Sequence, residues 1–396
     1  MSKTKILLTD IVNLNADASC LSSEQWLNML RKGSNSYLYQ WLSVYVKAKK
    51  KVSLGITGAT LADMRMHNPE TIDFINKNRN IFEIILRPFS HDIALLRSKE
   101  GFLLNLETGI KTLKREFNSY QNYFLPPEFM LTNEQVYILH TKRIEGTFIN
   151  PSRFKSEIEN RLPENPYYVK GLIGTEIKCI PLMGTLTQAY LQGIHYYNAD
   201  VWNKLLHTNN KIHFSWRDGE SSFFVPDGNE REYAWLQSEK KNIERLFLSE
   251  ALHKVEFDNN KNLKENHYHY YPVHSFTAWM KEFRMIGFVN KVIKTEGNIA
   301  KCNKKQKALW LQIINSDILS SIEKNSPQIK LKLKKEDTTL SDYTIWRCER
   351  GLEGEEFLAL LSSNFKRADI NAYLNKSMSH HMLKLRARLQ YLNKIL

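Results

Sequence analysis

The chain has 396 residues, 42% of them hydrophobic and 25% charged, which is the composition of a soluble globular protein long enough to bury a large core. No stretch approaches the about 18 apolar residues of a membrane span, and the first apolar run stops at Asp10, too short for a signal peptide. The net charge of +14 favours an anionic partner.

Cysteine usage predicts a reducing compartment. The four cysteines lie far apart and form no CxxC pair: Cys20, Cys179, Cys302 and Cys348. Such spacing is typical of reduced thiols in intracellular proteins rather than of disulfide-linked secreted ones. We therefore expect a soluble cytoplasmic protein.

In chain order, short apolar runs first alternate with helical patterns. The runs predict strands over residues 6–9, 51–58, 82–86, 123–125 and 147–149, and the first strand is expected to end at Asp10. Helical spacing predicts helices over residues 26–51, 101–117 and 135–141. Strands and helices that alternate at this pitch predict parallel βαβ units.

The later part of the chain is less regular. One strand is predicted over residues 212–216, followed by Arg217-Asp218-Gly219-Glu220, and one long helix over residues 230–255. Beyond Trp279 the spacing is helical, including residues 304–322. We place a domain boundary near residue 285, which gives a barrel-type domain over 1–285 and a helical domain with a basic end over 286–396.

Two carboxylates follow predicted strands and form a candidate pair. Pro126 and Pro127 end the fourth strand because proline cannot donate to a sheet, so Glu128 is presented just past a strand end. Asp218 follows the strand over 212–216. Active sites of α/β barrels lie at this edge, and paired carboxylates carry out glycoside cleavage. The alternative is that Glu128 is an acidic loop residue near a helix N-terminus, where the helix dipole favours it.

Several segments, in order along the chain, resemble motifs of glycoside hydrolase family 57, which includes 4-α-glucanotransferases, α-amylases and glycogen branching enzymes. Residues 52–61 with Pro69-Glu70 resemble its second-strand region, and Glu83-Ile84-Ile85 leading to His91 resembles its third-strand motif. Pro127-Glu128 resembles the motif that holds the nucleophile. Three further segments resemble the general-acid motif, a glucanotransferase segment and an Asn-Asp helix motif: Asp218-Gly219-Glu220, residues 271–279 and Asn315-Ser316-Asp317.

The resemblance implies a distorted (β/α)7 barrel with a C-terminal helical domain, and a retaining glycoside hydrolase or transglycosidase that acts on α-linked saccharides. Glu128 would be the nucleophile and Asp218 the general acid/base, with no metal and no cofactor. Candidate sugar-binding or supporting residues are Asp10, His91, Trp216, Glu220, Phe223, His274, Trp279 and Asp317. The alternatives left open are a structural histidine at position 91, a helix-capping aspartate at position 10, and aromatic residues that belong to the core.

Three departures from the family pattern favour a different class of function. The first strand continues as Asp10-Ile11-Val12-Asn13 where the family has a His-rich motif, and Leu125-Pro126 replaces a tryptophan in the nucleophile motif. The aromatic residue and histidine that usually follow the Asn-Asp motif are absent after Asp317. The second hypothesis is therefore a catalytically altered carbohydrate-binding or interaction protein.

The C-terminal segment concentrates positive charge. Residues 366–396 contain seven Lys or Arg residues and one Asp, a net charge of +6. Lys384, Arg386 and Arg388 lie on a predicted terminal helix, which is either a solvated face or a binding face for an anionic partner. A nucleic acid is the third hypothesis for that partner, and its binding would weaken steeply with salt.

Metal and nucleotide sites are weakly indicated. His267 and His269 would lie on one face of a strand, near His274, but no acid or cysteine close in sequence completes a ligand set. Asp10 and His91 would suit a deacetylase-type metal site, yet no His-x3-His pattern follows. The absence of a P-loop and of GxGxxG argues against a nucleotide cofactor.

Overall fold

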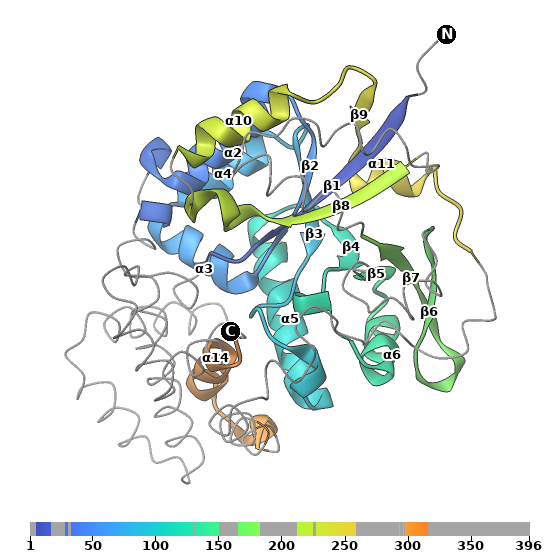
Figure 1. Cartoon of the computed structure of the whole chain (residues 1–396). Coiled ribbons are helices and arrows are strands. Elements are labelled where there is room, and N and C mark those ends of the chain that lie inside the picture. Colours follow the sequence, from blue (N-terminus) through green and yellow to red (C-terminus); the bar gives the residue numbers. More distant parts are fainter. Residues whose placement is uncertain are drawn as a thin grey trace, which may run out of the picture.

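A nine-stranded sheet organises the part of the chain that the computed structural model describes (Figure 1). The described residues are 5–16, 28–30, 33–129, 131–149, 165–182, 212–224, 227–258, 293, 296 and 298–315. The strand order is β6-β7-β5-β4-β3-β2-β1-β8, and β9 pairs with β1. All of these pairings are parallel except that of β6 with β7. The strands are β1 (Ile6–Leu14), β2 (Val52–Ile56), β3 (Phe82–Leu86), β4 (Gln121–Phe124), β5 (Gly146–Ile149), β6 (Tyr167–Lys170), β7 (Glu176–Pro181), β8 (Ile212–Asp218) and β9 (Ile243–Arg245).

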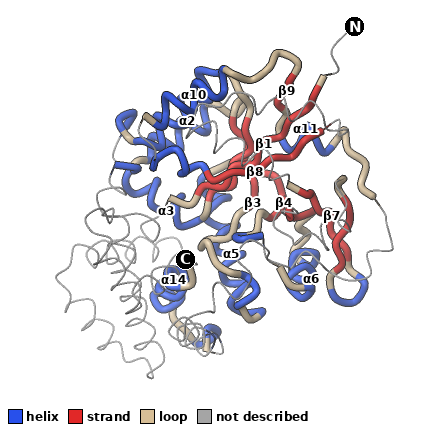
Figure 2. Tube along the Cα trace, in the orientation of Figure 1, coloured by secondary structure: helices blue, strands red, loops and turns tan. Residues whose placement is uncertain are grey.

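Most of the helices lie around the outside of the sheet (Figure 2), and one short helix packs against its inner face. The α-helices are α2 (Tyr37–Ala48), α3 (Gly58–His67), α4 (Pro69–Lys77), α5 (Lys99–Glu116), α6 (Asn133–Thr141), α10 (Gly228–Gln237), α11 (Leu248–Leu252) and α14 (Lys304–Ile313). Short 3-10 helices are η1 (Gly33–Asn35), η2 (Ala94–Leu96), η3 (Pro127–Phe129), η5 (Leu172–Gly174), η6 (Gly219–Phe224) and η8 (Ile299–Lys301).

Side chains that accept backbone N–H bonds set the starts of the helices after β2 and β3. Thr57 caps α3, Asn68 caps α4 with Pro69 in its first turn, and Ser98 caps α5. Thr132 and Gln135 form a reciprocal capping box at α6. These local signals fix where each chain segment leaves the sheet edge.

The two faces of the sheet carry two separate apolar cores. Leu8, Val12 and Leu14 of β1 belong to an outer core beneath the helices, whereas Ile11 belongs to an inner core, as the alternation of a strand requires. The inner core joins residues of β1, β3, β4, β5, β7 and β8, and α11 contributes Leu248 to it. Because strands at both sides of the order share this one core, the sheet curls into part of a barrel.

The predicted alternation of parallel strands and helices is confirmed, and the curled sheet is the barrel-type fold that the sequence implied. The predicted boundary near residue 285 and most of the predicted helical domain lie outside the described residues. Among the described helices, none has the length and apolar character to cross a membrane.

Two predicted elements are wrong. β1 does not end at Asp10 but runs on to Leu14, because residues 11–14 pair with β2 and Asp10 is neutralised by buried cations. The single helix predicted over 230–255 is instead α10, β9 and α11. β9 interrupts it because Ile243–Arg245 pairs in parallel with β1 at residues 6–8.

Candidate active site

Glu128 lies past the end of β4 in an unusual backbone conformation. Its φ is 55° and that of Phe129 is 56°, so two consecutive residues other than glycine occupy the left-handed region. Such conformations cost energy, persist where their surroundings hold them, and occur often at functional sites. Pro126 and Pro127 precede the turn with restricted φ angles, and the Leu125 N–H donates to the Leu86 carbonyl at 2.9 Å.

His91 follows β3 and lies beside Glu128. The distance from His91 Nε2 to Glu128 Oε1 is 3.5 Å, and both side chains are largely shielded from solvent. Asn105 of α5 holds the preceding loop, because its Oδ1 accepts from the Ser90 N–H at 2.7 Å. A Cβ at Gly109 would come within 2.7 Å of the Phe89 nitrogen, so glycine permits the close approach of α5 to this loop. The structure thus brings these two predicted site residues together.

Asp218 is the last residue of β8 and faces the first strand. The parallel register aligns it with Asn13 of β1, whose Nδ2 donates to Asp218 Oδ1 at 2.7 Å. Phe214 and Trp216 of β8 belong to the inner core, so alternation places Asp218 on the same concave face. One carboxylate oxygen of Asp218 is therefore fixed by an amide donor at the carboxyl edge of the sheet.

An aromatic contact joins the β4 and β8 sides of the concave face. The rings of Phe129 and Trp216 meet edge to face, with centroids 5.0 Å apart. Phe129 directly follows Glu128, and Trp216 is two residues before Asp218 on the same face. Because β3, β2 and β1 separate β4 from β8 in the sheet, this contact shows that the curl brings the two carboxylate-bearing strand ends toward each other.

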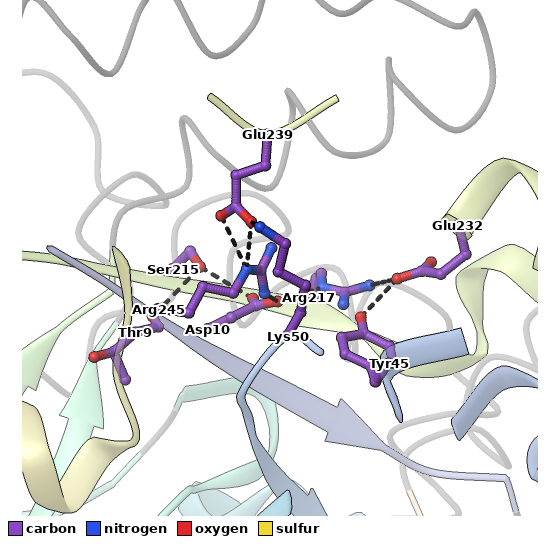
Figure 3. Close-up of polar contacts among 9 residues, drawn as sticks. All are labelled: Thr9, Asp10, Tyr45, Lys50, Ser215, Arg217, Glu232, Glu239 and Arg245. Atoms are coloured by element: carbon purple, nitrogen blue, oxygen red, sulfur yellow. Dashed lines mark hydrogen bonds and ion pairs between the residues drawn. The ribbon is translucent and has the colours of Figure 1, made fainter. Parts of the chain in front are cut away.

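Asp10 lies on the opposite face of β1, in a buried ion-pair network between the sheet and the outer helices (Figure 3). Asp10 Oδ2 is 3.0 Å from both Arg217 Nε and Arg245 Nη1, and Ser215 donates to Oδ1 at 3.0 Å. We call the six charged members the outer network: Asp10, Lys50, Arg217, Glu232, Glu239 and Arg245. The expectations that Asp10 ends a strand and that it binds sugar at the strand end are therefore wrong, since it lies within β1 and its carboxylate points into this network.

The cations of the outer network set the protonation of Asp10. Burial alone would raise the pKa of this carboxyl, but the Arg217 and Arg245 guanidiniums outweigh burial and hold the pKa below its ordinary value. Arg217 Nη1 is also 2.9 Å from Glu232 Oε1, which accepts a bond from Tyr45 at 2.6 Å. Both oxygens of Asp10 are thus engaged by Ser215, Arg217 and Arg245 on the face away from the inner core.

A second charged group lies beside His91 at the carboxyl edge of the sheet. We call Asp92, Arg97 and Glu296 the rim cluster; Arg97 Nε is 3.2 Å from Asp92 Oδ2, and Arg97 also pairs with Glu296. Burial raises the pKa of Asp92 to about 7, although Arg97 opposes the shift. A backbone bridge from Asp92 to Asn315 attaches the segment after α14 here.

The other predicted site residues lie in the core, in η6 or outside the described residues. Trp216 is only 7% exposed, so most of its ring is in the core, and Phe223 packs edge-on against Tyr37 outside the sheet. Glu220 lies in η6, two residues after Asp218. The residues His267, His269, His274, Trp279 and Asp317 lie outside the described residues. Within the described part of the chain, no three His, Cys, Asp or Glu residues are grouped to hold a metal ion.

Sequence reasoning missed two residues at this edge, Asn13 and Arg87. Both lie on the concave face, two positions after the inner-core residues Ile11 and Ile85. Alternation would have identified Asn13 if β1 had been extended past Asp10. Arg87 is 2% exposed and its Nη1 donates to the Leu125 carbonyl at 3.0 Å.

Comparison with known proteins gives a family and a fold for this chain. The model for glycosyl hydrolase family 57 matches residues 22–268, more than half of the chain. No curated protein matches in sequence.

Several solved structures share the fold at low sequence identity. The 4-alpha-glucanotransferase from Thermococcus litoralis has a TM-score of 0.62 at 14% identity, over 80% of this chain and 56% of that chain. The family 57-type branching enzyme from Pyrococcus horikoshii has a TM-score of 0.64 at 12% identity, over 99% and 96%. The alpha-amylase AmyC from Thermotoga maritima has a TM-score of 0.56 at 9% identity, over 99% and 97%. This chain thus spans little more than half the length of the glucanotransferase.

Proposed function

We propose that this chain, which belongs to glycosyl hydrolase family 57, is a retaining glycoside hydrolase or transglycosidase that acts on α-linked glucan-like or related saccharides. The observation that carries the proposal is the Phe129–Trp216 contact, because it draws the strand ends of Glu128 and Asp218 to one concave edge. The proposed substrate class follows that of three structurally similar enzymes, a glucanotransferase, a branching enzyme and an amylase.

In the first step, one Glu128 oxygen attacks the anomeric carbon while Asp218 gives its proton to the glycosidic oxygen. The carbon–oxygen bond breaks, the free alcohol leaves, and the sugar remains as an ester on Glu128. Asn13 donates to Oδ1 of Asp218 and so orients the carboxyl group that carries the transferred proton. His91 lies against Oε1 of Glu128 and orients the attacking carboxylate.

In the second step, Asp218 takes a proton from water or from a sugar hydroxyl, and that oxygen attacks the anomeric carbon. The ester bond breaks and the Glu128 carboxylate is restored, so the product keeps the α configuration. Water as the acceptor gives hydrolysis and a sugar hydroxyl gives transfer. This mechanism requires the two carboxyl groups about 5–5.5 Å apart.

The test is incubation with a panel of α-linked oligosaccharides, with proton NMR to identify the first anomer released. We expect an α product, and a loss of turnover of about 10³-fold or more in Glu128→Gln. Glu107→Gln on the exposed side of α5 is the matched control, because its partner is the surface residue Lys142. Release of the β anomer first would exclude the retaining mechanism.

A carbohydrate-binding protein without turnover is the second candidate, favoured by the first strand. Asp10 is engaged in the outer network, and the β1 residue that faces Asp218 is Asn13 rather than histidine. This candidate predicts saccharide affinity by calorimetry with no product from any substrate in the panel.

The basic C-terminal segment would then bind an anionic partner. Reversing Lys384, Arg386 and Arg388 to Glu should weaken that binding and reduce its salt dependence. Unchanged affinity for heparin and for nucleic acid in the reversed variant would leave these residues as a solvated face.

A further inference from the structure

Arg87 is a large buried side chain that the mechanism above does not use. It directly follows β3 and is 2% exposed. Ile85, two residues earlier, belongs to the inner core, so Arg87 extends from the concave face of the sheet. A guanidinium stays charged at any pH the protein experiences. A permanent cation is thus buried on the face that carries Glu128 and Asp218.

The aliphatic part of the Arg87 side chain packs over Gly55 of β2, where the strand has no side chain. A Cβ built at Gly55 would lie 3.2 Å from both Cγ and Cδ of Arg87 and 2.7 Å from Cδ2 of Leu125. The register aligns Gly55 with Asn13 of β1, which holds Asp218. Glycine therefore leaves the space in which Arg87 and Leu125 pack, at the same level of the sheet as the candidate acid/base.

The guanidinium ends on the backbone that leads to Glu128. Arg87 Nη1 donates to the Leu125 carbonyl at 3.0 Å. The next two residues, Pro126 and Pro127, have no N–H and restricted φ angles, so they offer no donor and few free torsions. The orientation of the Leu125 carbonyl is then transmitted to Glu128 through a short, stiff connection. A hydrogen bond from a charged donor holds that carbonyl more firmly than a neutral donor would.

We propose that Arg87 is the positioning residue of the nucleophile: it fixes the Leu125 carbonyl, and through the two prolines it sets the left-handed turn that aims Glu128 at the anomeric carbon. This inference rests on the proposed function. It assigns Arg87 no contact with the substrate, and it explains why residue 55 is glycine.

The experiment follows covalent labelling by a slowly released 5-fluoro-α-glucosyl fluoride, with intact mass read over time. Arg87→Met keeps the stem but removes the donor. We expect its labelling rate constant to fall about 10²-fold while the final labelled fraction stays complete, because a misplaced nucleophile is slow but present. Arg87→Lys, which keeps a charged donor, should recover part of the rate. A residue with a merely structural role would lower the labelled fraction and leave the rate constant unchanged.

Two further variants complete the design. Arg79→Met is the matched control, since Arg79 Nη2 also donates to a backbone carbonyl, that of Ser119 at 2.9 Å, before β4 rather than after it. Its labelling rate should equal that of wild type. Gly55→Ala perturbs the Arg87 stem without removing the charge, and it should also slow labelling.

The outcomes separate this inference from the proposed function. Full-rate labelling of Arg87→Met, or loss of the fold in both Arg87→Met and Gly55→Ala, overturns the positioning role alone. If wild type neither labels nor turns over any α-glucosyl fluoride, the proposed function fails and the positioning role fails with it.

Discussion

The outer network and the rim cluster are both buried, yet the pKa of Asp10 in the first is lowered and that of Asp92 in the second is raised. The outer network contains three cations and three carboxylates, and the pKa of Asp10 is held below its ordinary value. The rim cluster contains one cation and two carboxylates, and burial raises the pKa of Asp92 to about 7. The balance of partner charges, rather than depth, decides which form of a buried acid is stable.

The comparison also separates two roles around the sheet. The outer network joins β1, β8 and β9 on the convex side, and its central carboxylate, Asp10, stays ionised at neutral pH because its pKa is lowered. The rim cluster adjoins His91 and the segment after α14, and its Asp92 changes protonation near neutral pH. A fixed scaffold thus lies behind the sheet, and a titratable group lies beside the candidate site.

The largest expected effect comes from removing the central anion of the outer network. Asp10→Asn leaves Arg217 and Arg245 buried with one counter-charge fewer, so the free energy of unfolding should fall by about 3–5 kcal/mol at neutral pH. Urea denaturation measures this loss. Glu107→Gln, which breaks an exposed pair with Lys142, should cost at most about 1 kcal/mol. Equal small losses in both variants would contradict a firmly held network.

Replacing aspartate by asparagine in the rim cluster should change how the free energy of unfolding depends on pH. An unfolded aspartate loses its proton near pH 4, whereas folded Asp92 keeps it to about pH 7. Between these values the folded state binds the extra proton, so this group makes stability fall as pH rises, by up to about 4 kcal/mol. Asp92→Asn should remove this slope, which unfolding measured from pH 4 to pH 8 will detect.

Asp10 and Asp92 make the free energy of unfolding change with pH in opposite directions. Because the folded pKa of Asp10 is lowered, its contribution to stability is present above pH 4 and is lost as pH falls below that value. An Asp92→Asn variant with the wild-type slope between pH 4 and pH 7 would contradict a protonated rim carboxyl.

A smaller effect is expected within the outer network. Tyr45→Phe removes the 2.6 Å bond to Glu232 but leaves the Arg217–Glu232 pair in place. The free energy of unfolding should fall by about 1.5–3 kcal/mol, the usual contribution of a hydrogen bond to a charged group. Thermal unfolding at constant pH measures it, and a loss as large as that of Asp10→Asn would mean that the hydroxyl, not the charge balance, holds the network.

Local sequence signals were sufficient for the edge that carries the candidate pair. Pro126 and Pro127 mark the end of the fourth strand before Glu128, and apolar runs mark the strand ends before His91 and Asp218. Because these strands are parallel, their ends lie at one edge of the sheet. Strand alternation separates the two faces of β8, with Trp216 on the inner side and Arg217 on the outer side.

The errors arose where distant residues decide the local structure. From its neighbours in sequence, Asp10 is interpreted as a strand end. It lies within a strand because Arg217 and Arg245, more than two hundred residues later, neutralise its charge. β9 breaks an apparent helix because β1 pairs with it. Arg87 could not be identified from its neighbours in sequence, because its partners are the Leu125 carbonyl and the space above Gly55.

The roles of Glu128 and Asp218 are tested most directly by intact-mass measurement of two variants with α-glucosyl fluoride, whose leaving group needs little protonation. We predict that Asp218→Asn accumulates a covalent sugar adduct, because its nucleophile is intact but water is not deprotonated, and that azide releases the adduct. Glu128→Gln should form no adduct under the same conditions. An adduct on Glu128→Gln, or none on Asp218→Asn while wild type turns the fluoride over, would contradict the assignment of Glu128 as nucleophile and Asp218 as acid/base.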